Sequence, residues 1–600
     1  RREISQFSIM VLSTNKNMPL LGGLLLVFSA LEGGHALVAP PSSTRLQHHR
    51  SSGNDVIRPS APTLPFNLNS GVVPHTNWIE RQQPPSRVYH HSACVRRNNF
   101  ALRSSATSSS DATSATQETE APISITMIVG IASALVGYFY CKCLKIGFNV
   151  LWRQFPNSNL SKAIPSSKHI LCMMTLGGAI VATLSTLFFP TLFSAHDYVH
   201  VLSKESGSDD TKNKMDKFPG VKYMFPLLGL SLITSISGFS LGPEAPMVGA
   251  GSLVGVNLGR RYIKSKEKSG DSSGIDVSKL EETLAYAGAA GALTGALNFP
   301  LAGPIFALEF TSRRAGLAGA AGKNWNAVMM ASLAGMAVIR GLLVPTAHVG
   351  GHFTYSAKAA IGVLHGREMV LAGLGMGVCG AVAGTCFHKS VSFLKSAIWR
   401  KNESSKAVVI GKKVLLAMLI GYISTLFPQT MFWGEPSMQC MVDGQCTPFS
   451  ATPHGIPAAM MQAAIVNPNQ PFASGSAALQ VGLAKFSAIA LASAAKFPGG
   501  VIFPLLSNGA SLGHALVSAL GPVLPTASSS LVPPMMIMSF MAAMLTSITR
   551  TPAASVLILA FTASGITPLS VLLPGALMAS YVSVWVSERL SKDSFFSYSE

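Results

Sequence analysis

Charged side chains are scarce in this sequence. Asp, Glu, Lys and Arg make up only 12% of its 600 residues, whereas hydrophobic residues make up 48% and the mean hydropathy is +0.38. An average soluble domain carries about twice that share of charged residues. The composition therefore argues against a soluble globular protein and predicts an all-α polytopic membrane protein.

Acids are the scarcer of the two kinds of charge. The chain has 26 acids against 45 Lys and Arg, which gives a formal net charge of +19. A nucleic-acid-binding protein can be this basic, but its Lys and Arg gather on a soluble domain. Here they fall in the N-terminal segment and in short stretches between apolar runs, such as 260–268. We therefore expect loops that contact lipid headgroups, and no nucleic-acid partner.

Cysteines with metal-ligand spacing are missing. Cys141 and Cys143 form a C-x-C pattern inside an apolar stretch, which is more typical of packing than of a metal site. Cys440 and Cys446 lie in a polar loop, where a disulfide requires an oxidising compartment. The sequence predicts neither a metal site nor a cofactor.

Paired groups for acid–base or nucleophilic chemistry are also missing. His196 and Asp197 are adjacent, but a loop pair at a membrane boundary is more typically solvated. The charged stretch 365–370 is interpreted in the same way, as the start of a helix. We therefore do not expect an enzyme.

The first 122 residues differ from the rest. Residues 1–40 hold an apolar core that ends in small residues, as in a signal peptide. Residues 41–122 are rich in Ser and Arg, and the stretch 33–110 contains eight Arg, no Lys and only two acids. Such a segment is typical of a disordered transit peptide. Together they resemble the bipartite presequence of algae with secondary plastids; a disordered cytosolic tail is the alternative.

Apolar stretches fill the remainder of the chain. Several are interrupted by Gly or Pro, as in 223–256, 287–304 and 497–525. Broken helices in a membrane are tolerated only where the backbone is buried in protein or lines a cavity. The apolar stretches are 123–140, 169–193, 223–241, 283–309, 327–345, 369–387, 407–427, 478–495, 532–548 and 553–588.

A glycine–proline pattern occurs twice with the same spacing. G-x3-P-x4-G-x3-G is found at 242–255 and again at 500–513, and L-T-x5-P follows at 293–300 and at 545–552. Two aligned blocks indicate a duplicated fold. We expect a first repeat in 123–345, a second repeat in 346–590 and a short tail in 591–600.

Each copy of the pattern predicts a loop that is followed directly by a helix. Gly permits a sharp bend, and Pro suits the first helical turn, where its missing N–H costs nothing. A helix N-terminus presents unpaired N–H groups and a partial positive charge. Two such ends that converge in a membrane favour a site for an anion.

These residues resemble the CLC family of chloride channels and chloride/proton exchangers. The sequence GPEAPMVGAG (242–251) is similar to that family's G-(K/R)-E-G-P motif, and further segments follow in the family's order. The resemblance covers about 124–598. It implies the CLC fold, with two inverted-topology repeats of tilted and broken helices, and a homodimer with one pore in each subunit. The G-P-E variant and the presequence look most like the chloroplast-type branch of plants and algae. The further segments are GALTGALNFPLAGPIFALEF (291–310), FPQTMFWGEPSM (427–438), KFPGGVIFPLLSNGASLG (496–513) and MAAMLTSITRTPAASVLILAFTASG (541–565).

The resemblance makes Glu244 the gating glutamate, whose carboxylate occupies the outer anion site and swings away to open it. The competing interpretation is an acid that only caps its own helix. The residues expected to line the anion site are Ser194, Gly242, Pro243, Glu244, Ala245, Pro246, Gly500, Val501, Ile502, Phe503, Phe595 and Tyr598.

The sequence departs from the family at three places. The internal proton acceptor of coupled members is replaced by Phe310, which follows a retained Glu309 that we expect to be structural. Only Ser194 remains of the loop that supplies a serine hydroxyl. The terminal tyrosine ligand corresponds to Phe595, with Tyr598 three residues further on.

We therefore expect a passive chloride channel in a lipid bilayer. The alternatives are a chloride or nitrate/proton exchanger on the same fold, and a non-conducting membrane scaffold. Eukaryotic members of the family usually carry paired cytosolic regulatory domains after the membrane part; the sequence given ends at Glu600, so either these domains are absent or the chain is truncated. The presequence predicts a plastid membrane, either thylakoid or envelope.

Residues 1–122 fused to a fluorescent protein are expected to direct it to plastids of an alga with secondary plastids. Because the transit-like segment acts only after the signal segment, residues 41–122 alone are expected to leave the reporter in the cytosol. Fluorescence microscopy checks both. A reporter that stays cytosolic with the full segment contradicts the plastid assignment.

Overall fold

The computed structural model describes residues 121–155, 166–203, 218–270, 276–311, 321–343, 366–399, 405–434, 474–521, 532–562, 569–591 and 595–596. The predicted signal segment and the transit segment up to residue 120 lie outside these residues, as do Cys440, Cys446 and Tyr598. Within the described residues the structure is helical, and the one β-type pairing is an isolated bridge between Gly242 and Gly500.

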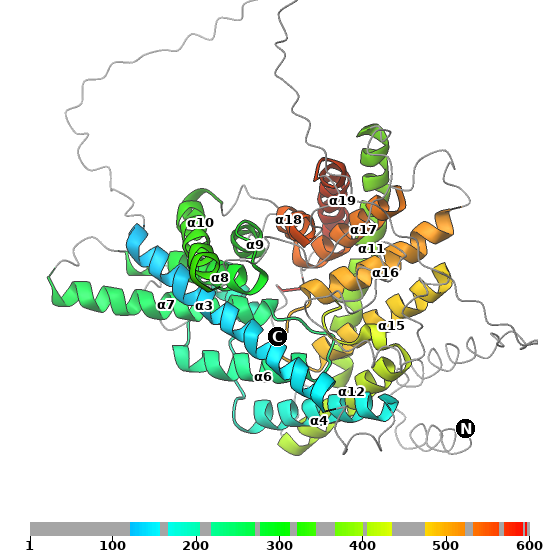
Figure 1. The fold of residues 1–600 in the computed structure, drawn as a ribbon, viewed down its shortest axis with the longest axis horizontal. Helices are drawn as coiled ribbons and strands as arrows, with labels where there is room; N and C mark the ends of the chain where they lie inside the picture. The colour runs from blue at the N-terminus through cyan, green and yellow to red at the C-terminus, as the bar shows by residue number, and fades with distance from the viewer. Residues whose placement is uncertain are drawn as a thin grey trace, which may run out of the picture. The chain divides into compact units, whose positions relative to one another are not determined.

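The described residues between 123 and 343 form helices of very unequal length (Figure 1). The stretch 283–309, which reads as one apolar run, is two helices with a break between them. The elements are α3 (Ile123–Phe148), α4 (Ser166–Leu187), α5 (Ala195–Ser203), α6 (Met224–Ile236), α7 (Glu244–Lys268), α8 (Val277–Leu297), α9 (Ala302–Thr311) and α10 (Ala321–Val338), with short irregular turns η1 (Asn149–Gln154), η3 (Val221–Tyr223) and η4 (Ile339–Leu343).

The described residues between 366 and 590 form a second series of helices. The stretch 553–588 again contains two of them, a short one and a long one. The elements are α11 (Gly366–Ile398), α12 (Lys406–Leu426), η5 (Pro428–Thr430), α15 (Gly475–Ala494), α16 (Ile502–Leu520), α17 (Val532–Thr549), α18 (Pro552–Thr562) and α19 (Leu569–Leu590).

The two series pack in the same pattern. In the first, α8 packs on α3, α7 and α10, and α3 also packs on α10. In the second, α17 packs on α11, α16 and α19, and α11 also packs on α19. The series touch each other through α4 against α12 and α9 against α18.

Matching breaks occur at matching places. The helix α8 ends at Asn298 (φ 62°), whose N–H donates to the carbonyl of Thr294 at 2.8 Å. The helix α17 ends before Arg550 (φ 60°), whose N–H donates to the carbonyl of Thr546, also at 2.8 Å. Pro follows two residues later in each case, where it begins or precedes the next short helix. The L-T-x5-P spacing therefore corresponds to one repeated backbone conformation.

Small residues let the helices of the first series approach closely. A Cβ added at Gly251 of α7 would overlap the carbonyl oxygen of Gly288 in α8, and one added at Gly288 would overlap that of Gly251. Helices in lipid gain stability mainly from such close packing, because lipid tails are as apolar as the side chains.

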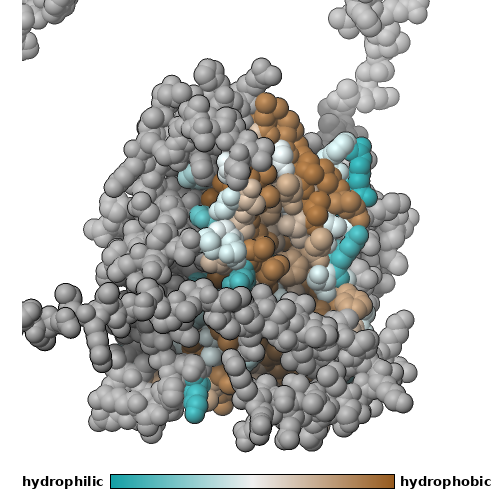
Figure 2. Space-filling view, turned by 90° about the vertical axis from the view of Figure 1, so that its right-hand side faces the viewer, coloured by the Kyte–Doolittle hydropathy of each residue, from teal (hydrophilic) through white to brown (hydrophobic). Residues whose placement is uncertain are grey.

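Large hydrophobic side chains remain exposed on the outer helices. Phe139 on α3 is 57% exposed and Leu371 on α11 is 55% exposed. Figure 2 shows a mostly hydrophobic surface over the coloured part of one face. Within the described part of the chain, six helices are long and apolar enough to cross a membrane, among them 123–152, 369–398 and 475–494. These surfaces fit contact with lipid.

Replacing Gly251 by Ala is expected to lower the melting temperature of the detergent-purified protein. The new methyl group has no room beside α8, and overpacking costs about 1–3 kcal/mol. Gly375→Ala in α11 is the matched control, because its Cβ meets nothing within 4 Å; its melting temperature is expected to hold or rise. Equal effects in the two variants would contradict the close packing of α7 and α8.

Candidate functional site

The two glycine–proline segments lie against each other. The N–H of Gly242 donates to the carbonyl of Gly500 at 2.7 Å, and the N–H of Gly500 donates to the carbonyl of Gly242 at 2.5 Å. The pairing is antiparallel. Two residues after each glycine a helix begins, α7 at Glu244 and α16 at Ile502. The pairing therefore brings two helix N-termini together.

The chain approaches this pairing in the same way from both sides. Gly238 (φ 103°) and Lys496 (φ 58°) each lie four residues before the paired glycine and adopt left-handed conformations. The rings of Phe239 and Phe497, one residue further on, lie 4.7 Å apart between centroids. Equivalent residues of the two halves therefore contact each other.

Glu244 is completely buried in this junction. Its carboxylate Oε1 accepts a hydrogen bond from the N–H of Phe503 at 3.4 Å, in the first turn of α16. A Cβ on Gly242 or on Gly500 would overlap this carboxylate. The side chain thus fits only because both paired residues lack side chains. Glu244, the first residue of α7, therefore places its carboxylate at the N-terminus of α16.

The residues of α16 that face this carboxylate are buried and apolar. The lining residues Val501, Ile502 and Phe503 are between 4% and 6% exposed. In such a setting the partial positive charge of a helix N-terminus is little screened. The geometry is suited to hold one small negative group, and the Glu244 carboxylate lies at this helix end. Of the expected lining residues, 242–246 and 500–503 are thus brought together.

Glu309 uses its carboxylate in a related way. Its two oxygens accept from the N–H groups of Ala553 (3.2 Å) and Ala554 (2.8 Å), at the start of α18. The side chain is 1% exposed. A carboxylate that caps a helix from another element is stabilising. The contact favours the structural role expected for this residue.

Phe310 lies in a cluster of aromatic rings. Its ring is 4.7 Å from that of Phe306 and 4.5 Å from that of Phe596. Phe596 lies 4.9 Å from Phe595, which in turn lies 5.9 Å from Phe387 of α11. Phe310 and Phe595, which the resemblance matches to an acid and a tyrosine of the family, are therefore joined by phenyl rings.

Ser194 is engaged at the start of α5. Its N–H donates to Asp197 Oδ2 at 2.7 Å, and its hydroxyl donates to the same oxygen at 2.6 Å. Asp197 is half-buried, which differs from the solvated loop pair that the sequence indicates. The signal for this contact is the S-x-x-D spacing, which resembles a capping box. The hydroxyl must turn away from Asp197 before it donates to an anion.

The sequence that forms these helices matches a known family. A family model described as voltage gated chloride channel matches residues 211–587. The chain belongs to this family. Among curated CLC relatives, the voltage-gated ClC-type chloride channel ClcB of Salmonella typhimurium is 26% identical over 376 residues, which is 61% of this chain and 73% of ClcB. The putative ion-transport protein YfeO of Salmonella choleraesuis is 24% identical over 407 residues, covering 66% of this chain and 80% of YfeO.

Solved CLC structures share the fold. A slow cyanobacterial Cl-/H+ antiporter superposes with a TM-score of 0.57 at 16% identity, covering 79% of this chain and 96% of the antiporter. A eukaryotic CLC transporter superposes with a TM-score of 0.53 at 15% identity, covering 79% and 72%. The expected CLC fold is confirmed, and the chain is a helical integral membrane protein of a family of anion channels and transporters.

Glu309→Ala is expected to lower the free energy of unfolding by about 1–3 kcal/mol, because the buried N–H of Ala554 and the partly buried N–H of Ala553 lose their acceptor. Glu309→Gln keeps an acceptor oxygen and is expected to lose less. Thermal melting of the detergent-purified variants checks the order. Equal stability of the wild type and the Ala variant would contradict a structural role for Glu309.

Proposed function

We propose that the chain is a passive anion channel that conducts chloride through a CLC-type pore. The observation that carries the proposal is the contact of the Glu244 carboxylate with the N–H of Phe503 at the start of α16. A carboxylate and a chloride ion are both attracted by the partial positive charge at a helix N-terminus. Glu244 is therefore the gate.

Opening requires the carboxylate to leave the Phe503 N–H. Either an incoming anion displaces it or a proton neutralises it, and both weaken its attraction to the helix end. The vacated position is lined by backbone groups near 244–247 and by those of Val501 and Ile502. Their side chains are apolar, so the anion is held by N–H groups and helix dipoles rather than by a buried cation.

The aromatic cluster supports a channel rather than an exchanger. A coupled exchanger needs a proton acceptor towards the inner side of the pathway, and Phe310 cannot carry a proton. Its ring contacts Phe306 and Phe596, which are equally unable to do so. The second candidate is a chloride or nitrate/proton exchanger, which is favoured by the fold it shares with a Cl-/H+ antiporter.

The inner ligands of the anion are the part of the pore that departs most from the family. Ser194 is assigned to the central anion by resemblance and favours chloride over nitrate. Phe595 stands where the tyrosine hydroxyl is expected and has none; Tyr598, which lies outside the described residues, is the other candidate. Weaker binding of the anion at the central site would favour rapid conduction, because an anion must also leave the site to cross the pore.

We further propose that the two halves are inverted repeats. An antiparallel contact between equivalent residues, as between Gly242 and Gly500, is what a two-fold axis produces. The neighbouring contact of Phe239 with Phe497 supports the same axis. By family resemblance we propose a homodimer with one pore in each subunit. The chloroplast-type branch and a thylakoid or envelope location rest on the G-P-E variant and the presequence.

In liposomes under a chloride gradient, the wild type is expected to carry chloride with a reversal potential that follows chloride alone. Adding a pH gradient is expected to leave that potential unchanged. Glu244→Gln is expected to increase chloride flux, since the neutral amide is a weaker competitor. Simultaneous recording of chloride and proton movement checks all three.

A reversal potential that shifts with pH in a fixed ratio would make the protein an exchanger. Absence of flux in both the wild type and Glu244→Gln, with folded protein, would leave the non-conducting scaffold.

A further inference from the structure

Lys485 is a completely buried lysine in the middle of α15. Its ammonium donates to three backbone carbonyls, those of Phe432 (2.9 Å), Thr430 (3.1 Å) and Met431 (3.4 Å). Three acceptors match the three protons of the charged form, whereas a neutral amine has only two. Among the described residues no carboxylate lies within ion-pair distance of it. Within the described part of the chain, backbone carbonyls are thus the partners of this ammonium.

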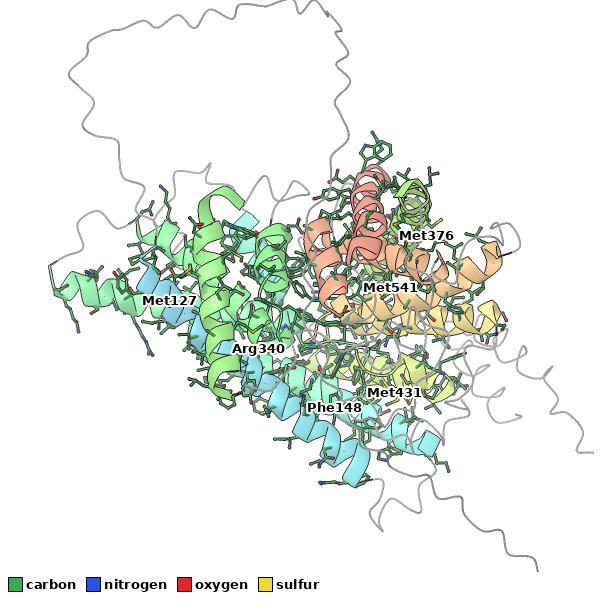
Figure 3. All side chains as sticks on the ribbon, turned by 45° about the horizontal axis from the view of Figure 1, so that its top comes forward. Met127, Phe148, Arg340, Met376, Met431 and Met541 are labelled. Atoms are coloured by element: carbon green, nitrogen blue, oxygen red, sulfur yellow. The ribbon has the colours of Figure 1, made fainter. Side chains whose placement is uncertain are left out.

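The loop that Lys485 holds reaches the first glycine–proline segment. This loop, residues 430–434, carries Met431, which Figure 3 labels together with Phe148 of α3. Phe432 adopts a left-handed conformation (φ 55°), and its N–H donates to the carbonyl of Gly238 at 3.0 Å. Its ring contacts Phe148 at 4.9 Å. Gly238 is the residue that turns the chain towards Gly242.

The same loop also reaches the helix that binds Glu244. A Cβ added at Gly434 would lie 2.9 Å from the Lys485 ammonium and would overlap the side chain of Ser507. Ser507 is four residues along α16 from Phe503, or about 6 Å at the helical rise. The ammonium thus lies on the order of 10 Å from the N–H that binds the Glu244 carboxylate.

From this placement we propose that Lys485 supplies a fixed positive charge to the outer anion site. The inference rests on the proposed function, since it concerns the same site. At about 10 Å and an effective dielectric constant of about 20, a unit charge changes the affinity for a monovalent anion roughly tenfold. The loop 430–434 holds the charge in place, and no carboxylate of the described residues lies within ion-pair distance of it.

If Lys485 had only a structural role, its substitutions would have different effects on anion binding. A buried charge that serves only packing can be replaced by an apolar residue of similar volume without loss. A lysine that serves only to fix the loop can be replaced by another hydrogen-bond donor. The field, in contrast, depends on charge and acts equally on every monovalent anion.

The test measures chloride binding to the detergent-purified full chain by isothermal titration calorimetry. All variants carry Glu244→Gln, because the carboxylate feels the same field as the anion and would mask part of the effect. Lys485→Gln and Lys485→Met are expected to weaken chloride binding about tenfold, and nitrate binding by the same factor. Lys485→Arg keeps the charge and is expected to bind within about threefold of the parent.

Lys413→Met is the matched control. Lys413 is also buried, but its ammonium donates to Ser185 Oγ at 2.9 Å, where α12 packs on α4. Chloride binding is expected to be unchanged in it. Unchanged binding in both Lys485→Gln and Lys485→Met overturns the inference, as does weak binding in Lys485→Met that Lys485→Gln restores.

Failure of the proposed function has a separate signature. If the Glu244→Gln parent binds no chloride, the anion site itself is wrong; if the parent binds and the Lys485 variants do not differ, only the inference is wrong. If both lysine replacements prevent folding, Ser507→Asp neutralises the ammonium in place. It is expected to weaken chloride binding by the same factor, and unchanged binding there overturns the inference.

Discussion

The antiparallel pairing of Gly242 with Gly500 is the contact on which the site depends. Two hydrogen bonds join the segments, and neither residue has a side chain that would keep the backbones apart. The pairing brings the starts of α7 and α16 together among buried residues. A helix end that is little screened then attracts whatever negative charge is near. The carboxylate of Glu244 is such a negative charge at this helix end. It fits between the paired segments because Gly242 and Gly500 have no Cβ atoms.

Much of this arrangement could be predicted from the sequence, because it depends on glycine and proline. Their spacing at 242–255 and 500–513 marks two loops that enter helices, and both helices begin two residues after the first glycine. The spacing at 293–300 and 545–552 marks a repeated helix end, although the left-handed residues there are Asn298 and Arg550 rather than glycine. Backbone constraints of this kind are local, so they can be read from sequence.

Side-chain partners were harder to predict, since they depend on which segments meet. The expectation of a solvated Asp197 missed its hydrogen bonds to Ser194, although the spacing of the two residues carried a signal. Nothing in the sequence around Lys485 indicates three carbonyl acceptors from a loop more than 50 residues earlier. The phenyl cluster is similar: Phe310 and Phe596 are separated by most of the second half of the chain, and only the fold brings their rings together.

The contact between Glu244 and Phe503 also has a thermodynamic meaning. While the carboxylate is bound, the chain itself supplies the negative group that the start of α16 requires. Once the carboxylate leaves, that N–H has no acceptor from this side chain, and a permeating anion becomes its replacement. A ligand that binds only the folded chain adds to its stability by mass action. In the proposed channel, the transported anion is thus also a ligand that stabilises the fold, and the open pore is most stable where that anion is abundant.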